Sequence, residues 1–120
     1  KLAIISNTSM TPGTTFRKFL FKNGLAQYFD ALIFSDELGI SKPNPDLFIY
    51  TLNKLSSAPK YTVHVGDQYQ TDIVGAKAAG INSILIDPNP TAEDWDGIYP
   101  SLTYDSLKSL ANNLNQMLSL

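Results

Sequence analysis

The chain has 120 residues, 43% of them hydrophobic and 17% charged, with a formal net charge of −2 and no cysteine. This length supports one domain with a real core, and the scattered basic residues argue against nucleic acid or an anionic membrane as partner. The missing cysteines exclude disulfides, thiolate catalysis and Cys-ligated zinc; with no apolar run of membrane-spanning length, we expect a cytoplasmic protein.

The N-terminal part of the chain predicts a strand followed by a helix. Residues 2–5 form a continuous apolar run, typical of a strand covered on both faces, and polar residues follow at 6–9. Thr11-Pro12 predicts a helix cap and a first-turn proline, and Asn23-Gly24 predicts the end of that helix. The chain begins inside the predicted strand and without Met, so we expect it to be cut from a longer protein.

A second strand and helix follow in the same order. Residues 31–34 predict the strand, and Lys42 lies in the proline-containing loop after it. Asn44 is a good N-cap with Pro45 at the first helical position. Apolar residues at 47, 48, 52 and 55 then recur at helical spacing, which predicts a helix with one buried face.

The third unit contains two carboxylates at a strand-to-helix turn. Residues 61–65 predict a strand that runs into Gly66-Asp67, and Asp72 follows at the start of a helix expected from about residue 70 to 79. Small residues in that helix predict close packing on the sheet, and Gly80 predicts a left-handed stop. Two acids near helix-start N–H groups could bind Mg²⁺, which takes one or two carboxylates and completes its shell with water and phosphate.

The rest of the chain predicts one more strand and helix. Residues 83–87 form the strand, a polar loop follows, and leucines at 107, 110, 114 and 118 mark a final amphipathic helix. Strands that alternate with helices indicate a parallel sheet with right-handed crossovers. We therefore predict an α/β, Rossmann-like fold in three αβα layers.

Three spaced segments together resemble the haloacid dehalogenase-like hydrolase superfamily. They are Ile5-Ser6-Asn7, then Ser41 to Pro45, then Val65-Gly66-Asp67 with Asp72 and the small-residue helix to Gly80. Each segment alone is weak, but the three in this order are specific. The resemblance covers residues 2–87 and implies a Rossmann-like core with one active site. On this basis residues 1–120 are interpreted as one partial hydrolase core domain.

The resemblance implies a role for each of five residues. The Ser6 hydroxyl and the Asn7 backbone amide would hold phosphoryl oxygens, and Lys42 would neutralise the charge of nucleophile and phosphate. Asp67 would ligate Mg²⁺, while Asp72 either completes the metal shell or orients its waters. The family's halide-removing members carry Ser and Asn where this chain has Gly66 and Asp67, so the sequence resembles the phosphohydrolase branch.

The family's nucleophile motif, Asp-x-Asp after an apolar strand, is absent from this sequence. Asp94 and Asp96 have no strand before them, and Asp87 ends a strand but has Asn89 at the second position, so both places are interpreted as loops. The expected order puts the nucleophile, a central first strand and a cap before Ser6. We expect an N-terminal segment, or another chain, to supply them, and we expect residues 1–120 alone to be inactive.

The implied function is Mg²⁺-dependent hydrolysis of a small phosphorylated metabolite through an aspartyl-phosphate. Two alternatives stay open: a non-catalytic module that binds phosphate or metal, and a metal-free 2-haloacid dehalogenase.

Structural explanations also exist for the individual residues. Ser6 and Asn7 are common turn formers, Lys42 could be a solvated lysine, and the two acids could favour a helix dipole. His64, within the predicted third strand, is interpreted as a packing residue with no catalytic role.

Overall fold

The structure is a computed structural model, and it describes residues 1–89, 95 and 97–118. The strands are β1 (Ala3–Ser6), β2 (Ala31–Phe34), β3 (Val63–Gly66), β4 (Asn82–Ile86) and β5 (Leu102–Tyr104). The α-helices are α1 (Gly13–Lys22), α2 (Ser35–Leu38), α3 (Pro45–Leu55), α4 (Val74–Ala78) and α5 (Leu107–Leu118). Two 3₁₀ turns, η1 (Ala26–Tyr28) and η2 (Pro59–Tyr61), and one π-helical turn, η3 (Tyr69–Ile73), complete the order.

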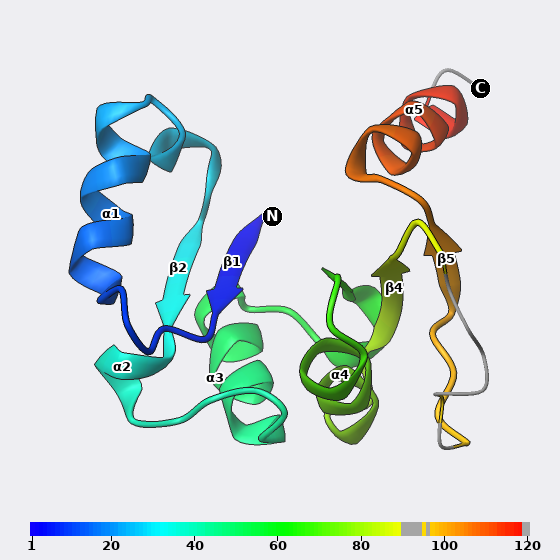
Figure 1. Cartoon of the computed structure of the whole chain (residues 1–120), viewed down its shortest axis with the longest axis horizontal. Helices are drawn as coiled ribbons and strands as arrows, with labels where there is room; N and C mark the ends of the chain where they lie inside the picture. The colour runs from blue at the N-terminus through cyan, green and yellow to red at the C-terminus, as the bar shows by residue number, and fades with distance from the viewer. Residues whose placement is uncertain (90–94, 96, 119–120) are drawn as a thin grey trace.

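The strands form two parallel sheets (Figure 1). One sheet pairs β1 with β2, and the other has the order β3-β4-β5, with every described pair parallel. Helices α1 and α3 lie on either side of β2, and α4 lies beside α3. The α/β, Rossmann-like prediction is therefore confirmed.

Most predicted elements are present, with three differences. The helix expected from about residue 70 begins as the π-helical turn η3 before it becomes α4. Strand β5 and the single-turn helix α2 were missed, because three or four residues are too few to show a period. Strand β4 is followed by another strand, whereas the sequence predicted that it would be the last one. Asp94 and Asp96 lie outside the described residues.

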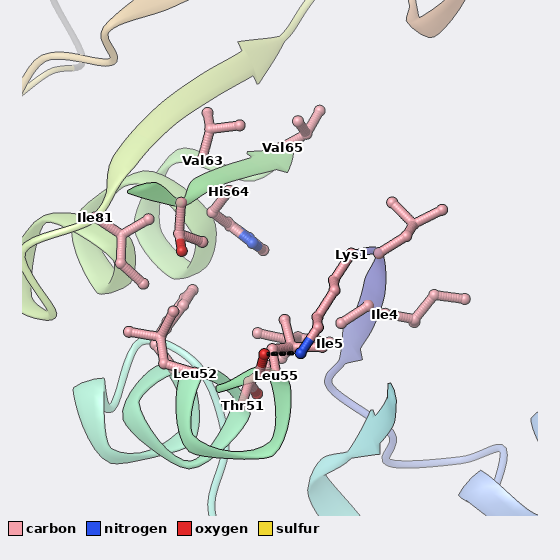
Figure 2. Close-up of a pocket in the computed structure, with 14 residues that line it drawn as sticks. Lys1, Ile4, Ile5, Thr51, Leu52, Leu55, Val63, His64, Val65 and Ile81 are labelled. Atoms are coloured by element: carbon pink, nitrogen blue, oxygen red, sulfur yellow. Dashed lines mark hydrogen bonds between the residues drawn. The ribbon is translucent and has the colours of Figure 1, made fainter. Parts of the chain in front are cut away.

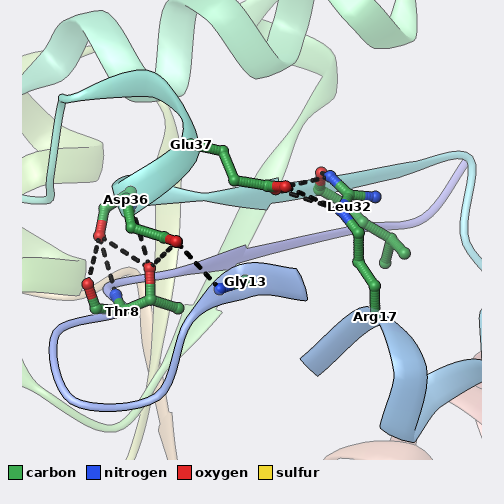
Figure 3. Close-up of polar contacts among 7 residues, drawn as sticks. Thr8, Gly13, Arg17, Leu32, Asp36 and Glu37 are labelled. Atoms are coloured by element: carbon green, nitrogen blue, oxygen red, sulfur yellow. Dashed lines mark hydrogen bonds and ion pairs between the residues drawn. The ribbon is translucent and has the colours of Figure 1, made fainter. Parts of the chain in front are cut away.

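The cap of α1 also differs from the prediction (Figure 3). Pro12 is the N-cap and makes no side-chain cap bond; instead the Gly13 N–H donates to both oxygens of Asp36, each at 3.1 Å. The Thr8 hydroxyl donates to the same carboxylate, and these bonds lower the pKa of Asp36 below its ordinary value. A residue far along the chain therefore caps α1, which local sequence could not indicate. The other predicted caps, at Asn44 and Gly80, are confirmed.

The core lies between α3, α4 and the strands. Phe48 and Leu52 from α3 meet Ala76 from α4 and Ile81, and all four are buried. A Cβ added at Gly75 would lie 2.6 Å from the Phe48 ring, so this glycine brings α4 close to α3. The small residues of α4 were expected to let this helix pack closely on the sheet. Gly75 instead lets α4 pack closely on α3.

An open slot separates the two sheets (Figure 2). Among the described residues, β1 pairs only with β2, and β3 pairs with β4, so one edge of each strand faces the slot. The slot has a volume of about 310 Å³ and is lined by residues of β1, α3 and β3 together with Lys1, Leu2, Thr62 and Ile81. Lys1 Nζ reaches across it to the Leu55 carbonyl at 2.6 Å.

Within the described residues, no helix is long and apolar enough to cross a membrane.

Candidate active site

All five residues singled out from the sequence line one small pocket. Ser6 ends β1 and Asn7 follows it, Lys42 comes from the loop before α3, and Asp67 and Asp72 follow β3. The pocket has a volume of about 170 Å³ and lies at the carboxyl ends of the parallel strands. Ligands of open α/β sheets bind at this edge, because loops from several strands meet there.

Lys42 is held firmly at this pocket. Its Nζ donates to Asp72 Oδ1 at 2.6 Å and to the Ile5 carbonyl at 3.2 Å, and only 10% of its side chain is exposed. An ammonium group has three N–H donors, so one is left for a ligand. The Lys42 backbone is held too, because its N–H and carbonyl both bond to the Asn7 side-chain amide, at 2.8 and 2.9 Å.

Both carboxylate oxygens of Asp72 are occupied. Oδ1 contacts Lys42 Nζ and His64 Nε2, the latter at 2.8 Å, and Oδ2 accepts from the Gln68 N–H at 3.1 Å. Burial, the largest influence, favours the neutral carboxyl, but the bonds from His64, Lys42 and Gln68 outweigh it. Together they hold the pKa of Asp72 at about 2, below its ordinary value of 3.8. Asp72 is therefore ionised at neutral pH and committed to protein partners.

Gly66 gives Asp72 room to reach back over the end of β3. A Cβ at Gly66 would lie 2.2 Å from Asp72 Cγ, a contact that no side chain could make. The π-helical turn η3 supplies the matching backbone: the Asp72 N–H bonds to the Gln68 carbonyl at 2.8 Å. Such turns occur often at functional sites.

Asp67 has the opposite environment. It is exposed, it lines the pocket, and no described residue donates a hydrogen bond to its carboxylate. A carboxylate with no described partner at this pocket suits Mg²⁺, which is usually bound by one or two protein carboxylates and takes other ligands from phosphate and water. Within the described ranges, no three His, Cys, Asp or Glu side chains gather as a complete metal cage. The residues present thus fit a partial Mg²⁺ site with Asp67 as its ligand.

Three further residues at the site were missed or set aside from the sequence. Gln68 and Thr71 also line the pocket. His64, interpreted as packing, does pack edge-on against Phe48 with ring centroids 5.0 Å apart, but it also contacts Asp72. The available signal was alternation in β3, which places residue 64 on the opposite face from its neighbours 63 and 65.

The fold and this pocket define an α/β protein with a polar pocket at the carboxyl edge of its parallel strands, and comparison with known proteins gives the family. Residues 1–86 match the family described as haloacid dehalogenase-like hydrolase, and the chain belongs to that family.

Individual relatives agree with this assignment. A relative from Methanothermobacter thermautotrophicus, named glyceraldehyde 3-phosphate phosphatase, is 33% identical over 82% of this chain and 42% of its own length. The HAD-hydrolase YfnB from Bacillus subtilis, whose crystal structure is described as bound to magnesium, superposes with a TM-score of 0.80 at 26% identity, covering 95% of this chain and 49% of that one. A 2-haloacid dehalogenase from Pseudomonas syringae superposes with a TM-score of 0.70 at 34% identity, over 82% and 42%. The chain thus spans about half the length of the proteins it matches.

Proposed function

We propose that the protein containing this chain is a Mg²⁺-dependent phosphohydrolase that acts on a small phosphorylated metabolite. The observation that carries the proposal is the pairing, in one pocket, of a held cation at Lys42 with a free carboxylate at Asp67. A phosphate monoester needs this combination, because its negative charge must be neutralised while a metal ion is held beside it. The relative named as a phosphatase supports the same class of reaction.

Each residue of the pocket has a specific part in this proposal. The Ser6 hydroxyl and the Asn7 N–H donate to the phosphoryl oxygens, and the remaining Lys42 N–H faces the charge that develops during transfer. Asp67 holds Mg²⁺, which when bound supplies further charge neutralisation and orients the phosphate. The Asn7 side chain acts on the loop and not on the ligand, because its amide is committed to the Lys42 backbone.

The proposal includes a β-strand from outside this chain, seated in the slot between β1 and β3. Two facing strand edges with unpaired backbone groups are stable only when another strand pairs with them. A parallel strand there would end beside Ser6 and Asp67, and an aspartate at its end could take the phosphoryl group and pass it to water. An N-terminal segment of the complete protein is the simplest source of this strand.

An aryl phosphate assay on the complete protein, with and without Mg²⁺, tests the proposed reaction. We expect turnover that depends on the metal. Phosphate binding without turnover would instead favour the non-catalytic module. Release of halide from a 2-haloacid without metal would favour the dehalogenase reaction, to which the Pseudomonas syringae likeness points.

The Asp67→Asn variant tests the metal assignment. Removing the charge from the free carboxylate should abolish turnover, a loss of 100-fold or more, on the order of that for a lost metal or oxyanion contact. The fold should stay intact, because no described residue depends on this side chain. Glu37→Gln, on the α2 turn away from the pocket, is the matched control and should keep full activity. Full activity of Asp67→Asn would remove the metal assignment.

A further inference from the structure

His64 lies between the slot and the candidate active site. Its side chain lines the slot between the sheets (Figure 2), while its Nε2 contacts Asp72, which lines the pocket. The ring is mostly buried, with 13% of the side chain exposed. It is therefore a polar group with a defined partner and not a general packing residue.

The chemistry of Asp72 determines which way this hydrogen bond runs. An ionised carboxylate can only accept hydrogen bonds, so the proton must lie on His64 Nε2. The accepting atom is Oδ1, the same oxygen that contacts Lys42 Nζ. Since Oδ2 is held from the other side by the Gln68 N–H, the carboxylate is held in place by contacts on both oxygens.

We propose that His64 is a positioning residue: through its Nε2–H bond it holds the Asp72 carboxylate, and through Asp72 it aims the Lys42 ammonium at the phosphoryl group. The proposal rests on the proposed function for the role of Lys42. It assigns Asp72 to the lysine and leaves the metal to Asp67, whose carboxylate is free among the described residues. Outer partners that orient a functional side chain commonly affect activity by about 10- to 100-fold.

Two substitutions at His64 separate positioning from packing. His64→Phe keeps a flat ring against Phe48 and removes the donor, whereas His64→Gln can place an amide N–H near the position of Nε2. In the complete protein we expect kcat on an aryl phosphate to fall by about 10-fold in His64→Phe and to recover largely in His64→Gln. The Mg²⁺ concentration for half-maximal activity should stay within about twofold of wild type, because Asp67 is untouched.

Two further variants supply the controls. Phe48→Leu removes the ring that packs on His64 without touching the hydrogen bond, so it should lower the melting temperature and leave the His64–Asp72 bond in place. In a Lys42→Met background, His64→Phe should have almost no further effect, because its influence passes through that lysine. Equal losses in His64→Phe and His64→Gln, or an undiminished loss in the Lys42→Met background, would overturn the proposal.

A readout that needs no turnover keeps this inference separate from the proposed function. The ¹⁵N NMR shifts of His64 should report a proton on Nε2 at neutral pH, and the preference for that tautomer should weaken in Asp72→Asn. If the assay shows no phosphatase activity while this signature is present, the proposed function fails and the His64–Asp72 bond stands. A proton on Nδ1 alone would contradict the positioning role whatever the activity.

Discussion

At the scale of single residues, the two aspartates of the site are alike in sequence and opposite in environment. Asp67 is exposed and bonds to no described residue through its carboxylate, whereas Asp72 is 3% exposed and bonded through both oxygens. Removing a partner from a buried ion pair leaves an uncompensated charge, which costs several kcal/mol, whereas changing an exposed side chain costs little. Their spacing alone predicted two acids near one another, and packing gave them different partners.

The depressed pKa of Asp72 predicts a dependence of stability on pH. Its folded value of about 2 lies below the ordinary 3.8, so the folded protein binds fewer protons than the unfolded chain at acid pH. Stability from this group is present above about pH 4 and is lost as the pH falls toward 2, by about 2 kcal/mol in total. Urea unfolding of the complete protein at several pH values measures this loss. The same series on Asp72→Asn should show a flatter dependence, and an unchanged slope would contradict the assigned environment.

At the scale of elements, α3 and α4 hold two parts of the site at a fixed separation. The Lys42 loop leads into α3, and the η3 turn with Asp72 leads into α4. The two helices meet at Gly75, where an added Cβ would lie 2.6 Å from the Phe48 ring and 3.0 Å from Pro43 Cα. Because Phe48 is buried and Pro43 contributes backbone, neither neighbour can move away easily.

Gly75→Ala therefore tests whether this contact positions the site. The alanine gains up to about 1 kcal/mol of helix propensity, but overpacking costs about 1 to 3 kcal/mol, so we expect a net loss of stability of about 1 kcal/mol. Separation of α3 from α4 should also reduce kcat, since Lys42 and Asp72 lie on different sides of the contact. Lys77→Ala, exposed on the same helix, is the control and should change neither quantity. A stabilised, fully active Gly75→Ala would show that the helices can separate freely.

At the scale of the whole molecule, the slot is the dominant feature. A compact chain of this length should have a radius of gyration of about 13.6 Å, and the observed value is 14.6 Å. Apolar residues beside the slot are correspondingly exposed, Leu2 at 52% and Val63 at 51%. The facing edges of the two sheets carry backbone N–H and C=O groups without a strand partner among the described residues, and another strand normally hydrogen-bonds to such edges.

We expect residues 1–120 expressed alone to lack phosphatase activity and to bind the dye ANS at the exposed apolar surface of the slot. Adding the proposed N-terminal strand, as a separate chain or in the complete protein, should remove dye binding and restore turnover. Hydrogen exchange should then show new protection at the amides of β1 and β3. If residues 1–120 alone were as active as the complete protein, the proposed strand would be contradicted. The control is the same added segment with proline placed in its apolar strand, because proline cannot donate the backbone hydrogen bonds that pairing needs.

Local sequence was sufficient for much of this molecule. The runs at 31–34 and 83–87, the Asn44 cap and the Gly80 stop depend on near neighbours, and they were predicted because short-range sterics and hydrogen bonding determine them. The three spaced segments also placed Ser6, Lys42 and Asp67 at the ends of successive units. In a parallel sheet such ends meet at one edge, so the pocket itself followed from the order of the elements.

Only the tertiary structure decided which groups bond to which. Asp36 caps α1 across 23 positions, His64 and Lys42 share one oxygen of Asp72, and Asn7 holds the Lys42 backbone. These bonds join residues distant in the chain, and their partners depend on which face of each strand is buried and how closely the helices approach. Local sequence patterns cannot predict those distances, because the distances are set by tertiary packing.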